Sequence, residues 1–156
     1  MTTVGITGHQ RIPEEALNYV TRRMIECLES QAAPLVGYSS LAIGADQIFA
    51  QSVLDLGGQL MAIIPCEGYE ATFSKEDLPA YKQLLIQAQA TVLDFPEPSE
   101  RAFMAAGEEV IDSSDVIIAI WDGLPAAGLG GTADAVAHAR SLGKQVVVIW
   151  PEGVQR

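Results

Sequence analysis

The sequence has few basic residues for its size, and this shortage argues against one class of partner. Nine Lys and Arg stand against 20 Asp and Glu among 156 residues, so the net charge is −11. Proteins that bind duplex nucleic acid usually gather Lys and Arg on one face. Here only Arg22 and Arg23 are adjacent, and we place both on a solvated helix face. We therefore expect no nucleic acid as a main partner.

Cysteine, histidine and long apolar runs are also scarce. Cys27 and Cys66 lack the close spacing of metal ligands, and His9 and His138 are far apart in the sequence. No apolar run approaches the roughly 20 residues that cross a bilayer. The N-terminus enters a strand pattern at once, without the features of a signal peptide. These absences predict a cytoplasmic protein with reduced thiols, no bound metal and no membrane contact.

Apolar residues, in contrast, are plentiful and regularly arranged. They make up 49 % of the chain, enough for the core of one domain over residues 1–156. Short apolar runs predict strands at residues 3–7, 35–38, 60–64, 91–95, 116–121 and 145–150. Helices are predicted to begin near Pro13, Asp46, Asp77, Ser99 and Thr132. This alternation predicts a single-domain α/β Rossmann-like three-layer sandwich, with a mostly parallel six-stranded sheet and helices on both faces.

The stretch from Trp121 to Arg140, WDGLPAAGLGGTADAVAHAR, carries the strongest functional signal. It joins an apolar strand to a helix, with Thr132 predicted as the helix cap. The connecting loop contains four glycines: Gly123, Gly128, Gly130 and Gly131. Glycine lets the backbone approach a ligand, and the first turn of a helix offers unpaired N–H donors to an anion. We interpret this loop as a phosphate- or nucleotide-binding loop; the alternative is a flexible connection.

Small and polar residues follow the other predicted strands. The candidates for ligand contact are Gly8, His9, Gln10, Gly44, Ala45, Asp46, Trp121 and Asp122. In parallel α/β sheets, ligands bind beyond the carboxyl ends of the strands, so these residues are expected along one rim. Three of the candidates keep a structural alternative. His9 could be an exposed turn residue, Asp46 a helix cap rather than an acceptor for ribose or base, and Trp121 a core residue rather than an apolar wall.

The segment 66–77 is long for a connection between a strand and a helix, and such loops often act as lids or binding loops. It carries Tyr69 and Phe73. Either ring could stack on a base, whereas the alternative is that both pin the loop to the core.

The sequence resembles the SLOG superfamily. This Rossmann-like group includes LONELY GUY-type phosphoribohydrolases, the Rossmann domain of DNA-processing protein A, and molybdenum-cofactor carrier proteins. The resemblance covers nearly the whole chain and rests on GITGH at 5–9, GAD at 44–46, DVIIAIWDG at 115–123, and Gly130-Gly131-Thr132. It implies a nucleotide or nucleotide derivative as ligand, and pairing of two copies through helices.

The enzymes of that group carry a PGGxGTxxE motif, from which this chain departs. Gly131 and Thr132 match its GT, but Ala135 stands where the glutamate is expected. Asp134 is one position early, which rotates its side chain by about 100° around a helix. Asp134 and Arg101 are therefore the catalytic candidates, with Arg101 in place of the upstream arginine of the family.

These observations favour a nucleotide-binding protein, a sensor or carrier, whose phosphate is held by the glycine loop 128–132. One alternative is an enzyme that cleaves the N-glycosidic bond of a nucleoside monophosphate. Another is a carrier of the molybdenum cofactor, and the last is a partner-binding module with a vestigial site.

Overall fold

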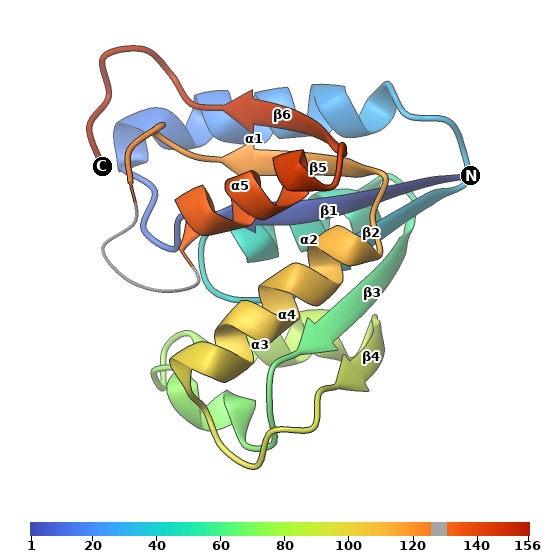
Figure 1. Ribbon diagram of the computed structural model, residues 1–156, viewed down its shortest axis with the longest axis vertical. Coiled ribbons are helices and arrows are strands. Elements are labelled where there is room, and N and C mark those ends of the chain that lie inside the picture. Colours follow the sequence, from blue (N-terminus) through green and yellow to red (C-terminus); the bar gives the residue numbers. More distant parts are fainter. Residues whose placement is uncertain (126–130) are drawn as a thin grey trace.

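Six strands form one parallel sheet with the order β4-β3-β2-β1-β5-β6 (Figure 1). The computed structural model describes residues 1–125 and 131–156. Its strands are β1 (Thr2–Gly8), β2 (Leu35–Ser39), β3 (Gln59–Ile64), β4 (Gln89–Val92), β5 (Val116–Ile120) and β6 (Gln145–Ile149). Its helices are α1 (Glu14–Glu29), α2 (Ala45–Asp55), α3 (Leu78–Leu85), α4 (Glu100–Asp112), α5 (Thr132–Ser141) and the short 3₁₀ helix η1 (Tyr69–Thr72). The predicted α/β Rossmann-like fold is confirmed.

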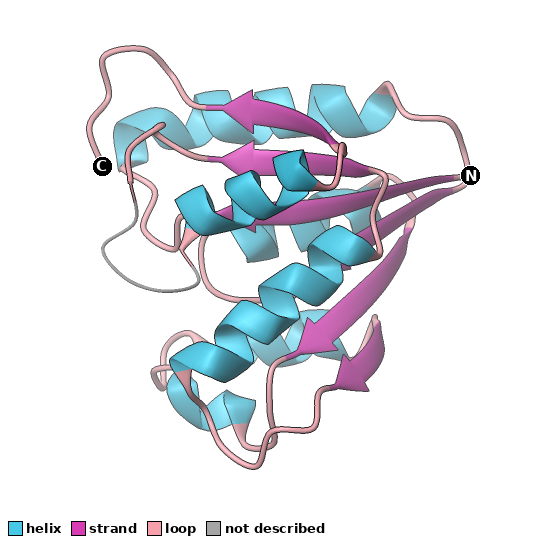
Figure 2. Ribbon diagram, in the orientation of Figure 1, coloured by secondary structure: helices cyan, strands magenta, loops and turns pink. Residues whose placement is uncertain are grey.

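The chain reverses its direction across the sheet between β1 and β5. From β1 it moves outward through β2 and β3 to β4, and then returns to pair β5 with the other side of β1. Helices α1, α2 and α3 cover one face, and α4 and α5 cover the other (Figures 1 and 2). The carboxyl ends of β1 and β5, paired from Val4 with Val116 to Gly8 with Ile120, therefore flank the switch point.

The core follows from the apolar spacing of these elements. Every residue of β5 is buried, as expected for a central parallel strand covered on both faces. Helix α1 turns a stripe with four-residue spacing into the core: Ala16, Val20, Met24 and Leu28. None of the helices in the described part of the chain is long and apolar enough to span a membrane.

The prediction for the fourth strand was displaced toward the C-terminus by two residues at its start and three at its end. Strand β4 spans Gln89–Val92, not residues 91–95, and all four of its side chains are exposed at the sheet edge. Leu93 and Phe95, which suggested the strand, instead turn inward after it and pack against buried clusters. An edge strand needs little apolarity, so the apolar signal came from the residues that follow it.

Among the residues at the predicted helix starts, one caps its helix with its side chain. Ser99 caps α4 by accepting a hydrogen bond from the Ala102 N–H at 3.0 Å, which confirms the prediction. Thr132 is not the cap of α5: that position belongs to Gly131, and Thr132 is the buried first residue of the helix. No side chain of the described residues caps this helix. Asp46 is likewise not the cap of α2, because Gly44 occupies that position.

Helix α4 places Phe103 at the edge of its buried stripe. Ala102, Ala106 and Val110 form the buried stripe, whereas Phe103 is 40 % exposed at its edge. The ring of Phe103 is tilted against that of Tyr69, with the centroids 6.2 Å apart. Phe103 is therefore available to line a surface cavity.

Candidate functional site

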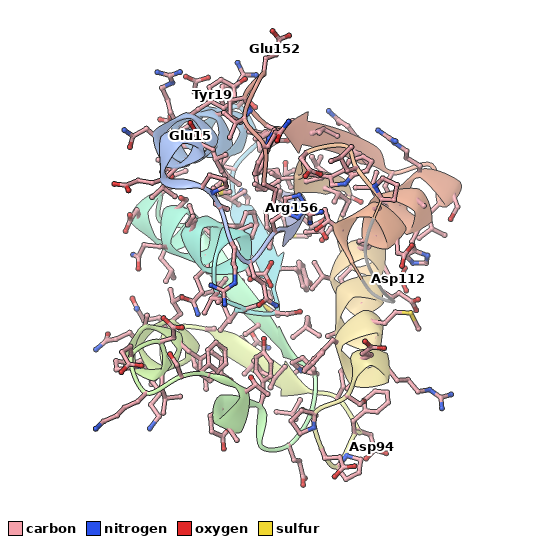
Figure 3. The ribbon with its side chains drawn as sticks, turned by 90° about the vertical axis from the view of Figure 1, so that its left-hand side faces the viewer. Glu15, Tyr19, Asp94, Asp112, Glu152 and Arg156 are labelled. Carbon is pink, nitrogen blue, oxygen red and sulfur yellow. The ribbon has the colours of Figure 1, made fainter. Side chains whose placement is uncertain are left out.

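A cleft of about 710 Å³ lies beyond the carboxyl ends of β1 and β5, at the switch point. Figure 3 looks toward this end of the sheet and shows Arg156 between the layer of α1 and α2 and the layer of α4 and α5. Besides Arg156, the cleft is lined by the loop after β1, the start of α2, the segment 66–77, the first half of α4 and the first turn of α5.

Most of the sequence-predicted residues meet at this cleft. Those that line it are Gly8, His9, Gln10, Asp46, Trp121, Gly131 and Thr132. Four candidates are not among the lining residues: Gly44, Ala45, Asp122 and Gly123. Gly128 and Gly130 lie outside the described residues. The seven lining residues therefore lie together along one rim of the sheet, where they were expected.

Packing explains why glycine occurs at positions 8 and 44. A Cβ on Gly8 would lie 2.5 Å from the Cβ of Ala45, because the start of α2 presses on the end of β1. A Cβ on Gly44 would lie 2.2 Å from the carbonyl oxygen of Gln10, and the backbone there has a φ of 83°. The loops after β1 and β2 thus meet backbone to backbone, and the Ala45 N–H donates to the His9 carbonyl oxygen at 3.1 Å.

His9 is buried, not an exposed turn residue, and it joins three segments of the chain. Its Nδ1 lies 3.0 Å from Nη1 of Arg156, and its Nε2 lies 3.4 Å from Oδ1 of Asp122. A guanidinium can only donate, so Nδ1 accepts from Arg156. Nε2 also lies 3.2 Å from the backbone nitrogen of Asp122, whose N–H points to it, so both ring nitrogens face N–H donors. The edge of the His9 ring also contacts Trp150, with the ring centroids 5.4 Å apart.

The electrostatics of this cluster favour a neutral imidazole. Burial, and then the positive charge of Arg156, lower the pKa of His9, while Asp122 opposes them. The side chain of Asp122 is only 4 % exposed, and Arg156 Nε lies 3.2 Å from its Oδ2. That approach lacks hydrogen-bond geometry, so Oδ2 is buried without a hydrogen-bond donor among the described residues. Arg156 thus compensates the charge of Asp122 but leaves it an unused acceptor.

Asp46 reaches the cleft from the first turn of α2. Its Oδ2 accepts one long hydrogen bond, 3.3 Å from the Ala42 N–H, and no other bond to the carboxyl is found among the described residues. Burial raises the pKa of Asp46 to about 7, against the smaller opposing effect of the Ala42 N–H. The negative charge of Asp46 in turn adds to burial in raising the pKa of the Tyr69 hydroxyl. Asp46 is therefore a poorly solvated carboxyl that faces the cavity.

An aromatic cluster holds the segment 66–77 in place. Phe73 stacks on Tyr81 with ring centroids 4.4 Å apart, and Tyr69 meets both rings edge to face. Tyr69 and Tyr81 are buried, which agrees with the interpretation that these rings pin the segment to the core. The rings of Tyr69, Phe73 and Phe103 line the cleft and form its apolar wall beside Asp46.

The catalytic candidates of the sequence lie away from this cavity. Arg101 and Asp134 are both exposed, and neither lines the cleft. The acidic side chains that do line it are Asp46, Asp77 and Glu100, and the lysine or arginine that does so among the described residues is Arg156. Asp134 and Arg101 therefore do not form, at the cleft, the pair of a carboxylate and an arginine that the family motif implies.

Sequence reasoning missed Arg156, Glu100 and Phe103. Arg156 follows the last strand in a short polar segment without any motif, so no local signal marks it. Glu100 and Phe103 stand in the first turn of α4, where an acid and an apolar residue are ordinary. Among the described residues no group of three or more His, Cys, Asp or Glu could hold a metal ion.

Comparison with known proteins shows the fold. No model of a known protein family matches the sequence, and no curated protein matches it. The structure is similar to DNA processing protein A from Streptococcus pneumoniae, with 21 % identity, a TM-score of 0.71, and coverage of 98 % of this chain and 51 % of that one. It is also similar to DNA processing protein A from Helicobacter pylori, which has a single-stranded DNA binding mode. The identity is 23 %, the TM-score is 0.68, and the match covers 99 % of this chain and 66 % of that one.

A third neighbour is the molybdenum cofactor carrier protein from Chlamydomonas reinhardtii, with 17 % identity, a TM-score of 0.60, and coverage of 94 % of this chain and 75 % of that one. These neighbours are two of the kinds of protein that the SLOG resemblance names, so the resemblance in fold is confirmed. The chain spans about half the length of the Streptococcus protein and about two thirds of the Helicobacter protein.

Proposed function

We propose that the cleft binds a nucleotide or nucleotide derivative, with its phosphate at the first turn of α5, and that the protein acts as a sensor or carrier. The observation that carries this proposal is the position of that turn at the cleft: Gly131, Thr132 and Ala133 all line it, and no side chain of the described residues caps the helix. Uncapped first-turn N–H groups and the helix dipole attract an anion.

The cleft has the size and lining that such a ligand needs. Its volume of about 710 Å³ is within the usual range of small-molecule pockets, roughly 300–1,000 Å³. Aromatic edges from Tyr69, Phe73 and Phe103 offer an apolar wall to a base, and Arg156 adds one positive charge. The position at the topological switch point is where parallel α/β sheets bind ligands.

Cleavage of an N-glycosidic bond is less well supported, because Asp134 and Arg101 are exposed outside the cleft. Single-stranded DNA, suggested by the Helicobacter neighbour, would have to approach a cleft with three acidic side chains and a protein of net charge −11. The carrier neighbour makes a phosphorylated cofactor the alternative cargo. The first two enter the test below, as a reaction product and as a competing ligand.

Thermal unfolding with a ligand panel tests the proposal. The panel contains nucleoside mono-, di- and triphosphates, NAD, ADP-ribose, inorganic phosphate and a single-stranded oligonucleotide, and each mixture is chromatographed afterwards. A ligand at 100 times its Kd should stabilise the protein by about 2.7 kcal/mol. Stabilisation by an intact nucleotide is expected. Release of free base would instead identify a hydrolase, and stabilisation by the oligonucleotide alone would overturn the proposal.

Two matched variants of α5 locate the phosphate. Ala133→Glu puts a negative charge in the first turn at the cleft, where glutamate still suits the helix dipole. Ala137→Glu makes the same change on the exposed side of the helix. We expect Ala133→Glu to weaken nucleotide binding at least tenfold and Ala137→Glu to leave it unchanged, as measured by calorimetric titration. Equal affinities of the two variants would rule out phosphate binding at α5.

A further inference from the structure

The two ends of the cleft differ in charge. At one end Arg156 balances the charge of Asp122, and the first turn of α5 adds the positive end of a helix dipole. Asp77 precedes α3 and Glu100 begins α4, and they make the other end negative. In Figure 1 the first turn of α4 lies beside η1 and α3, away from the first turn of α5 and the C-terminus, so these ends are separated. A ligand with anionic groups at both ends would meet repulsion at one of them.

The Asp46 carboxyl determines which hydrogen-bonding groups the uncharged part of the ligand must carry. An ionised carboxyl only accepts hydrogen bonds, and its two oxygens accept side by side. Here Oδ2 accepts one long bond from Ala42 and Oδ1 accepts none from the described residues, although the carboxyl lines the cleft. The neighbouring wall is apolar and aromatic, with Tyr69 and Phe73 on it. A flat ring with two adjacent N–H donors fits both features.

We propose that the cleft selects a guanine nucleotide with a single anionic end, its phosphate between Arg156 and α5 and the N1–H and N2–H donors of guanine on the Asp46 carboxylate. This inference rests on the proposed function and names the base. Guanine presents two adjacent donors on its Watson–Crick edge. Adenine and cytosine place an acceptor beside their single amino donor, and uracil flanks its one N–H with two carbonyl acceptors.

The surroundings of Asp46 explain why such a pair would discriminate strongly. Burial makes the negative charge of this carboxyl costly, as its raised pKa shows. Two ligand donors would offset that cost, whereas an adenine acceptor opposite a carboxylate oxygen would add repulsion. When only the correct ligand can hydrogen-bond a buried polar group of the site, an analogue that lacks the donor leaves that group unpaired and binds weakly.

Calorimetric titration of the full chain with GMP, IMP and AMP at pH 8 tests the inference from the ligand side. IMP keeps the N1–H donor and lacks the N2 amino group, and AMP reverses the pattern of donor and acceptor. A good bidentate pair discriminates by roughly 5- to 150-fold. We expect GMP to bind at least tenfold more tightly than AMP, with IMP between them.

Two variants of α2 test it from the protein side. Asp46→Asn replaces one acceptor with a donor, and Asp55→Asn makes the same change at the exposed end of the helix. Asp46→Asn should abolish the preference for GMP over AMP, and Asp55→Asn should keep it.

The outcomes separate the two proposals. Equal binding of GMP, IMP and AMP to the wild-type protein would overturn the guanine assignment and leave nucleotide binding intact. The same conclusion follows if Asp46→Asn weakens GMP and AMP equally, because Asp46 would then act only in maintaining the cleft. Absence of binding by all three, together with no stabilisation by the wider panel, would overturn both proposals.

Discussion

The loop after β2 and the loop after β5 both contribute a glycine with positive φ and a carboxylate that turns inward, yet they use these residues differently. Gly44 has a φ of 83° and Gly123 a φ of 84°. A Cβ would collide with backbone atoms of the loop after β1 at Gly44, whereas at Gly123 none of the described residues comes within 4 Å of one. Gly44 is therefore required by packing as well as conformation, and Gly123 by conformation alone.

The two carboxylates differ in the same way. Asp122 faces Arg156 and His9, so a positive side chain compensates it. Asp46 faces aromatic rings and receives a single long bond from the backbone, so its charge is compensated little. Similar sequence patterns at one rim therefore have different roles. Asp122, after β5, holds the Arg156 cation in place, whereas Asp46, after β2, keeps a carboxyl oxygen free for a ligand.

The largest expected effect comes from the glycine pair. Gly44→Ala should destabilise the protein by about 3 kcal/mol, because overpacking adds to the strain of a left-handed backbone. Gly123→Ala should cost about 1 kcal/mol, because only the backbone strain remains. Urea unfolding of both variants measures the difference. Similar losses for the two would show that the crowding at Gly44 relaxes without cost.

Removing the cation should have an intermediate effect. Arg156→Gln leaves the buried Asp122 carboxylate without its positive partner, and we expect a loss of about 1–2 kcal/mol, since Arg156 is 39 % exposed and its charge is partly screened. Because Arg156 lowers the pKa of His9, the variant should also raise that pKa toward or above its ordinary value.

Unfolding at pH 8 and an NMR titration of the His9 ring measure these two effects of Arg156→Gln. Arg140→Gln, at an exposed site in the last turn of α5, serves as the control. An unchanged His9 titration in Arg156→Gln would mean that the contact between the two side chains is not maintained in solution.

The smallest effect concerns Asp46 and pH. Its folded-state pKa, about 7, lies above the ordinary 3.8, so the folded protein binds more protons than the unfolded chain between these values. Its contribution is therefore complete at low pH and is lost as the pH rises through 7. With screening by solvent in the cleft, we expect a decline on the order of 1 kcal/mol between pH 5 and 8.

Asp46→Asn should flatten this decline, and Asp55→Asn should not, as measured by Tm across that pH range. Parallel pH profiles of the wild type and Asp46→Asn would show that the carboxyl titrates at its ordinary value. The ligand preference for guanine would then lack its energetic basis, although its hydrogen-bond geometry would remain.

Local patterns predicted the elements well where the apolar signal and the element coincide. The buried run of β5 and the four-residue spacing of α1 are examples, because both periodicities report which side of an element faces the core. The prediction failed at β4, where exposed residues form the strand and the apolar ones follow it. It also failed for Thr132 and Asp46 as caps, because cap position depends on backbone conformation one or two residues away.

The α/β alternation, the glycines at the rim and the region of the cleft could be read from the residues alone, because they depend on neighbours along the chain and on the common geometry of parallel sheets. The contacts of His9 required the folded chain: Arg156 meets it across a separation of 147 residues, and the backbone nitrogen of Asp122 lies 3.2 Å from its Nε2 across 113. Contacts of that range follow from strand order, which places β1 between β2 and β5. The same order brings Asp46, Arg156 and the first turn of α5 to one cavity.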